Sequence, residues 1–92
     1  MMRIHTRIEE AAVTLLVAGT LNAAGVPDFD RALDEARRLR RPVVLDLSNV
    51  RLIDRPTLKY LIDLMDHDVK LTVCPDYIEH WIYRESGREM LG

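Results

Sequence analysis

Three histidines and one cysteine are the first candidates for chemistry in this chain. His5, His67 and His80 lie far apart, and none has another His, Cys or Glu at a spacing that holds a metal ion. Cys74 follows an apolar segment, which predicts a buried, inert thiol rather than a redox centre. We therefore expect no metal site and no cofactor.

Serine and aspartate offer no clearer catalytic motif. Ser48 and Ser86 lack the flanking glycines of a nucleophile elbow, and no glycine-rich phosphate loop is present. Asp46 and Asp54 could form a pair of catalytic carboxylates. The pattern instead favours Asp46 at the end of a strand and Asp54 as the cap of a helix. We therefore predict that the protein is not an enzyme.

The segment of residues 43–58 organises the chain. Its apolar start, residues 43–47, predicts a buried central strand, and Ser48-Asn49 predicts a polar turn after it. The following Asp54-Arg55-Pro56-Thr57 is typical of a helix start, because a capping residue precedes a proline in the first turn. Free backbone N–H groups point outwards at such a junction, which makes it the best candidate for a functional site.

Hydrophobic periodicity and turn residues predict the remaining elements. In chain order we expect strand 3–8, strand 12–19, a helix with Asn22 as its cap and its regular part starting near Pro27, strand 43–47, helix 56–66, strand 69–73, and a helix from Pro75 to Gly87. The tight link between the first two strands implies an antiparallel pair. Strands joined through a helix are expected to be parallel, with right-handed crossovers.

The strands alternate polar and apolar residues, with Asp46 between Leu45 and Leu47. A parallel sheet covered on both faces would consist of continuous apolar runs. We therefore predict an α/β fold, a small mixed β-sheet of about four strands with helices mainly on one face. The chain forms one domain, residues 1–92, with residues 88–92 as a loose tail. Trp81 falls on the apolar stripe of the last helix and is expected in the core.

Composition excludes two classes of function. The formal net charge is -2, and the arginines of residues 37–41 cluster where a helix ends, so we expect no nucleic-acid binding. No segment approaches the roughly 20 apolar residues that cross a bilayer, and the start of the chain has no signal-peptide run. A lone thiol fits a reducing compartment. We expect a soluble, cytoplasmic protein without direct membrane insertion.

Three local motifs resemble the STAS domain, a family named for sulfate transporters and anti-sigma-factor antagonists. Residues 13–22 (VTLLVAGTLN) resemble a family strand that ends in Gly-x-Leu-Asp. Residues 43–50 (VVLDLSNV) resemble its Val-Val-Leu-Asp-Leu-Ser-Gly-Val strand, and residues 52–58 (LIDRPTL) resemble its Ile-Asp-Ser-Ser-Gly-Leu loop. The resemblance implies a small mixed sheet with helices mostly on one side. It also implies a non-catalytic bacterial regulator of transcription, an anti-anti-sigma factor that binds an anti-sigma kinase and is released when the second loop serine is phosphorylated.

The chain departs from the family pattern at the residues of this switch. Arg55 stands at the first loop serine, Pro56 at the phospho-acceptor serine and Thr57 at the glycine. Asn22 replaces the acidic residue after Gly-x-Leu. Pro56 cannot be phosphorylated. Thr57 could be a displaced acceptor, but our favoured interpretation is that its hydroxyl serves the helix cap.

The resemblance implies a partner-docking surface made of Asn22, Asp54, Arg55, Pro56, Thr57 and Leu58. The expected partner is an anti-sigma factor or a related kinase-like regulator. Two alternatives stay open: an accessory subunit of a membrane (lipid) transport ATPase, and a module that binds a nucleotide or phosphate metabolite at the helix start. The sequence also leaves a homodimer open.

Overall fold

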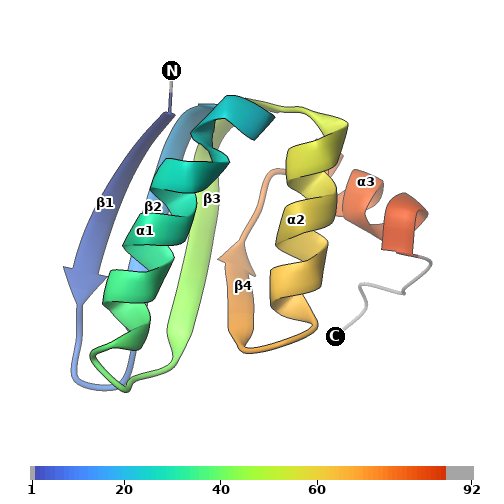
Figure 1. Ribbon diagram of the computed structural model, residues 1–92. Helices are drawn as coiled ribbons and strands as arrows, with labels where there is room; N and C mark the ends of the chain where they lie inside the picture. Colours follow the sequence, from blue (N-terminus) through green and yellow to red (C-terminus); the bar gives the residue numbers. More distant parts are fainter. Residues whose placement is uncertain (1, 87–92) are drawn as a thin grey trace.

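The computed structural model describes residues 2–86 and forms a four-stranded mixed sheet with three α-helices (Figure 1). In chain order the elements are β1 (Met2–Ile8), β2 (Val13–Leu21), the short 3-10 helix η1 (Ala23–Gly25), α1 (Val26–Arg37), β3 (Val43–Ile53), α2 (Arg55–Met65), β4 (Val69–Val73) and α3 (Asp76–Ser86). The predicted loose tail, residues 88–92, lies outside the described residues.

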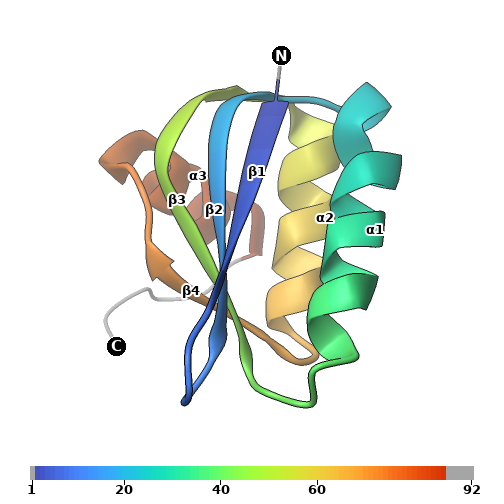
Figure 2. The same ribbon diagram turned by 90° about the vertical axis from the view of Figure 1, so that its left-hand side faces the viewer.

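The strands lie in the order β1-β2-β3-β4. β1 and β2 are antiparallel because a short link joins them, whereas β2, β3 and β4 are parallel because α1 and α2 carry the chain back between them. α1 and α2 cover one face of the sheet, and α3 lies at its β4 end beside α2 (Figures 1 and 2). This arrangement confirms the predicted α/β fold and the one-sided placement of the helices.

One hydrophobic core lies between the sheet and the helices. Its side chains come from alternate positions of β2 and β3 and from the inner faces of the helices. They are Val13, Leu15, Val17, Leu21, Phe29, Leu33, Ala36, Val43, Leu45, Leu47, Val50, Ile53, Leu58, Leu61, Leu64, Val69, Ile78 and Ile82. The prediction for Trp81 was too strong, since its side chain is only partly buried and packs against the edge of this core.

β3 is longer than predicted, because it continues through Ser48-Asn49 to Ile53. The expected polar turn is wrong. Two register shifts against β2 place extra residues in β3 there, so this part of the strand is bulged. The Asp46 carboxylate stabilises the first bulge by accepting hydrogen bonds from the hydroxyl and the backbone N–H of Ser48, at 2.6 and 2.9 Å. These bonds hold the pKa of Asp46 below its usual range.

The entry into α1 also differs in detail from the prediction. Asn22 precedes η1, but its side chain makes no capping hydrogen bond, so the predicted side-chain cap is wrong. The regular helix begins at Val26, with Pro27 in its first turn, close to the predicted start. The backbone N–H of Gly25 instead donates to the carbonyl of Asn22, which closes the 3-10 turn.

Candidate functional site

The candidate site lies where the carboxyl ends of β2 and β3 meet the start of α2. Asp54 directly follows β3, and its backbone N–H donates to the carbonyl of Leu21 at the end of β2. Two chain segments that leave the sheet are therefore joined here. Function in open α/β sheets is commonly placed at this end of parallel strands.

Asp54 connects two helix starts through one carboxylate. Its Oδ1 accepts the backbone N–H of Thr57 at 3.0 Å, which caps α2 and confirms the predicted cap. Its Oδ2 accepts the backbone N–H of Ala23 at 3.1 Å, in the first turn of η1. Thr57, through its side chain and its N–H, together with Ala23, lowers the pKa of Asp54, although desolvation opposes the shift. The carboxylate thus stays charged and fixes the shape of the loop.

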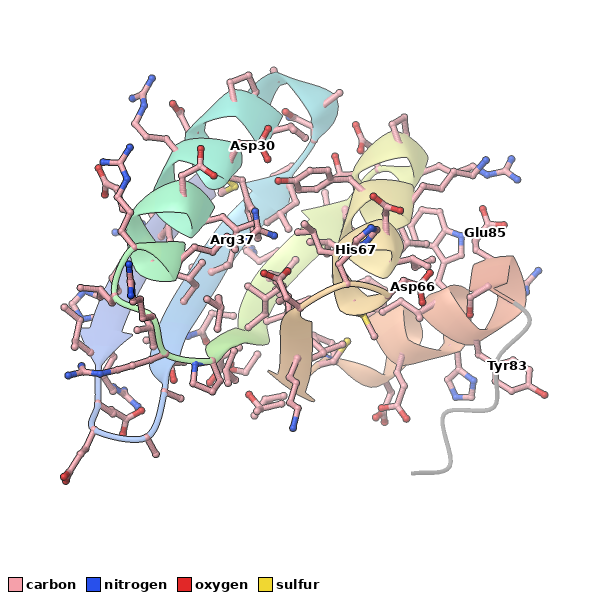
Figure 3. All side chains as sticks on the ribbon, turned by 60° about the horizontal axis from the view of Figure 1, so that its bottom comes forward. Asp30, Arg37, Asp66, His67, Tyr83 and Glu85 are labelled. Carbon is pink, nitrogen blue, oxygen red and sulfur yellow. The ribbon has the colours of Figure 1, made fainter. Side chains whose placement is uncertain are left out.

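Arg55 is exposed but does not lie free in solvent. Its Nε donates to Glu85 Oε1 at 2.5 Å, and a second guanidinium nitrogen lies 3.4 Å from Glu85 Oε2. Glu85 belongs to the part of α3 that lies beside α2, whereas Tyr83 points away from α2 (Figure 3). This ion pair ties the first residue of α2 to the last turn of α3.

Pro56 and Thr57 have opposite environments although they are neighbours. Pro56 is exposed in the first turn of α2, while Thr57 is only 3% exposed. The Thr57 hydroxyl favours the charged form of Asp54, yet it forms no hydrogen bond of good geometry with any described residue. The interpretation that this hydroxyl serves as the cap is therefore wrong, because the cap bond joins the Asp54 carboxylate to the backbone of Thr57.

The six residues predicted for docking do not form one surface. Asn22, Arg55 and Pro56 are exposed, and Asp54 is half-buried between them and the strand ends. Leu58 is fully buried in the core, as Thr57 nearly is. Only the first four can reach a partner in this conformation.

Two large side chains with apolar surface are exposed next to this loop, of which sequence reasoning missed Leu52. Leu52, near the end of β3, is 63% exposed, and Tyr77 on α3 is 46% exposed. The Tyr77 hydroxyl donates to the carbonyl of Arg51 at 2.7 Å, which holds the ring against the end of β3. The bulges in β3 bring Leu52 out of the regular alternation, and the sequence carries no clear signal for them.

A hollow of about 610 Å³ lies between the start of α2 and α3. It is lined by Arg55, Tyr77, His80, Trp81, Arg84 and Glu85. Arginine, tyrosine and tryptophan, which line most of it, are the residue types enriched among the side chains that dominate binding energy in protein interfaces. The hollow therefore extends the exposed loop towards α3.

Within residues 2–86, no set of three or more His, Cys, Asp or Glu side chains could hold a metal ion. Cys74 is half-buried, and burial raises the pKa of its thiol to about 11, as expected for an unreactive thiol. None of the described helices is long and apolar enough to cross a membrane.

Comparison with solved structures identifies the fold. An anti-sigma factor antagonist from Mycobacterium paratuberculosis superimposes with a TM-score of 0.78 at 15% sequence identity, over 94% of this chain and 79% of that chain. The chain has the SpoIIAA-like, or STAS, fold. An uncharacterized protein of the DUF3478 family from Shewanella loihica PV-4, described as SpoIIAA-like, matches the same share of this chain and 76% of its own, with a TM-score of 0.58 at 12% identity.

The STAS fold confirms the resemblance inferred from the three motifs. It is detected through structure, since no model of a protein family matches the sequence and no curated protein matches it. At such low identity the likeness concerns the arrangement of strands and helices. The role of the loop has to be argued from the residues of this chain.

Proposed function

We propose that this STAS-fold domain is a non-catalytic protein–protein interaction module of the anti-anti-sigma type. It docks a regulator through the exposed loop residues Asn22, Asp54, Arg55 and Pro56 and the start of α2. The likeness in fold to an anti-sigma factor antagonist is the observation that carries this proposal.

The rigidity of the loop supports a docking role. Asp54 is fixed by two backbone N–H groups, and Arg55 is paired with Glu85. A surface that is already ordered loses little conformational entropy when a partner binds. Leu52 and Tyr77 add exposed apolar area beside the loop, which suits a partner with a complementary apolar patch.

The loop works without the serine switch in this proposal. Pro56 has no hydroxyl, and Thr57 is almost fully buried. A kinase would reach Thr57 only after the first turn of α2 opened, which would break the bond from its N–H to Asp54. The partner is therefore held constitutively, or it is controlled from its own side.

A nucleotide or phosphate at the start of α2 has less support. Helix N-termini bind anions through free N–H groups. Here the N–H of Thr57 already donates to the Asp54 carboxylate, that of Leu58 donates to the Asp54 carbonyl, and Pro56 has none. A charged carboxylate also occupies the position that a phosphate would take.

Co-purification of the tagged domain from its host tests the proposal. The expected partner is an anti-sigma factor or a related kinase-like regulator. Arg55→Glu combined with Pro56→Glu should weaken its binding at least tenfold, because it replaces the exposed charge and shape of the loop. Arg38→Glu combined with Arg40→Glu changes two exposed arginines at the far end of α1 and should leave binding unchanged.

Two results would contradict this proposal. Recovery of a transport ATPase in place of a sigma regulator would favour the role of accessory subunit. Equal binding by the loop variant and the wild type would exclude the loop as the docking surface, with circular dichroism as the check that both proteins are folded.

A further inference from the structure

The face of the sheet that points away from α1 and α2 is uncovered at β1 and β2 (Figure 2). We call it the outer sheet face. Arg3, His5 and Arg7 lie on it, because they alternate along β1 with residues that turn towards the helices, and all three are exposed. Their cross-strand neighbours on β2 are Ala18, Leu16 and Thr14, respectively, which share this face.

Two adjoining hollows of about 510 and 600 Å³ lie on the outer sheet face. Both are lined by Arg3, Ala18 and Asn49. The first also includes His5 and Leu16, and the second extends over Thr20 and Arg51 at the bulged part of β3. Together they form an elongated depression that crosses β1, β2 and β3.

The depression has a positive charge that the described part of the chain does not neutralise. No carboxylate lines either hollow, although the whole chain has a formal charge of -2. Neither Arg3 nor Arg51 forms an ion pair with another of residues 2–86, whereas four other ion pairs occur in that range. Two acids reach this face, both at its Arg7 end, away from the hollows: Asp46 is bonded to Ser48 and lies near Arg7, and Glu9 accepts a hydrogen bond from the Thr14 hydroxyl.

The floor between the basic side chains is apolar and only half-covered. Leu16 and Ala18 are half-buried and lie beside the exposed row on β1. Most sheets bury such a surface against a layer of helices. Among residues 2–86, no helix covers this side of β1 and β2, so an apolar stripe with a basic border remains open.

We infer that the outer sheet face docks an acidic amphipathic helix of a partner protein. Alternate residues on β1 are about 6.8 Å apart, so Arg3, His5 and Arg7 form a row with that repeat. Every fourth residue of a helix repeats at about 6 Å, so carboxylates at that spacing can face the row. Apolar side chains of the same helix then cover Leu16 and Ala18.

Two other occupants fit the outer sheet face less well. A membrane surface requires apolar side chains that protrude into the bilayer, whereas the apolar residues here form the floor of a depression. Single-stranded nucleic acid requires aromatic platforms for its bases, and no aromatic side chain lines either hollow. This surface lies on the sheet rather than on the docking loop, so the inference goes beyond the proposed function.

Titration of the isotope-labelled protein with a synthetic peptide tests this inference by NMR. The probe is an 18-residue helical peptide with glutamate and leucine at matching helical spacings, and its control has lysine in place of glutamate. Addition of the acidic peptide should shift the backbone amide signals of β1, Ala18 and Asn49. Raising the NaCl concentration from 50 to 300 mM should weaken binding, because the contacts are between exposed charges.

Charge reversal supplies the second test. Arg3→Glu combined with Arg51→Glu should weaken binding of the acidic peptide by about fivefold or more, because two attractive charge pairs become repulsive. Arg38→Glu combined with Arg40→Glu makes the same change in net charge in the turn after α1 and should have no comparable effect. The loop variant Arg55→Glu/Pro56→Glu should also bind the peptide normally, so failure of this inference is separable from failure of the proposed function.

Three outcomes would overturn the inference. The first is that the acidic peptide causes no shifts on β1, or that it binds Arg3→Glu/Arg51→Glu as tightly as Arg38→Glu/Arg40→Glu. The second is tight binding of the lysine control. The third is binding of phosphatidylglycerol vesicles or single-stranded DNA without binding of the acidic peptide, which would assign the charge of this face to a different class of ligand.

Discussion

Replacement of Asp54 by alanine should destabilise the fold by about 2 to 2.5 kcal/mol at pH 7. The loss of a helix cap costs about 1 kcal/mol. The second bond, from the N–H of Ala23 at 3.1 Å, has a charged acceptor. A hydrogen bond of this kind contributes about 1.5 kcal/mol at the lower end of its range. Asp54→Asn keeps one oxygen for the N–H of Thr57 but turns its amide N–H group towards Ala23. Its loss in the free energy of unfolding should therefore be roughly half that of Asp54→Ala.

The effect of Asp54→Ala should depend on pH with a defined sign. The pKa of Asp54 is lowered in the folded state below its ordinary value, chiefly by the side chain of Thr57. A carboxyl with a depressed pKa contributes stability that is fully present above the unfolded-state pKa and is lost as the pH falls through the folded-state pKa. The difference between wild type and Asp54→Ala should therefore be constant from pH 7 to about pH 4 and should shrink below that.

Urea unfolding followed by the fluorescence of Trp81, the single tryptophan, measures these differences. Asp63→Ala removes an exposed carboxylate from the second half of α2 and should change the free energy of unfolding by less than about 0.5 kcal/mol. If Asp54→Ala behaves like Asp63→Ala at pH 7, or if its effect is the same at pH 7 and pH 3, the role assigned to the bridging carboxylate is refuted.

Three further predictions concern single side chains. Thr57→Val should change the free energy of unfolding by less than about 0.5 kcal/mol, because removing a buried hydroxyl without a well-formed hydrogen bond offsets the loss of its support for the charged form of Asp54; a loss of about 2 kcal/mol in thermal unfolding would contradict this interpretation of Thr57. Arg55→Glu should cost about 0.5 kcal/mol by repulsion from Glu85, and the swapped pair Arg55→Glu/Glu85→Arg should restore it; no recovery would show that the pair adds nothing. Cys74 should react with iodoacetamide at pH 8 more than about 100 times slower than free cysteine until urea unfolds the protein, because its thiol has a pKa of about 11; equal rates in native and unfolded protein would disprove this.

The regular parts of the fold could be predicted from the sequence. β4 has the predicted limits, because Val69, Leu71 and Val73 alternate strictly with polar residues. α2 begins at Arg55, one residue before the predicted start. The prediction is this close because a capping Asp54 and a proline at position 56 together indicate a helix start. Local signals of this kind are sufficient wherever the periodicity is unbroken.

The end of β3 could not be predicted, because its bulges break the periodicity. Leu47, Val50 and Ile53 are all buried, yet they are spaced three residues apart, which is the period of a helix rather than a strand. Only the pairing with β2 shows that this segment is extended. The consequence is that Arg51 and Leu52 are both exposed, which the alternation alone would not allow.

The candidate site could be predicted in part. The cap by Asp54 follows from local sequence, but its bond to Ala23 joins residues 31 positions apart and requires the tertiary fold. The sequence pattern does indicate the burial of Thr57, because Thr57 lies four residues before Leu61 and seven before Leu64 on the same helix stripe. A polar residue on the apolar stripe of a helix is therefore better predicted to be buried than to be an exposed phosphate acceptor.

Residues 54–57, where α2 starts, present no exposed hydroxyl to a kinase. Asp54 is committed to two backbone bonds, Arg55 to Glu85, Pro56 has no hydroxyl and Thr57 faces the core. The charge of the docking loop is therefore fixed under the proposed function. Control then has to act on the partner or through a second surface of this domain. If the outer sheet face docks an acidic helix as inferred above, that helix would contact Arg51, only three residues before Asp54, and this face would then be such a second surface.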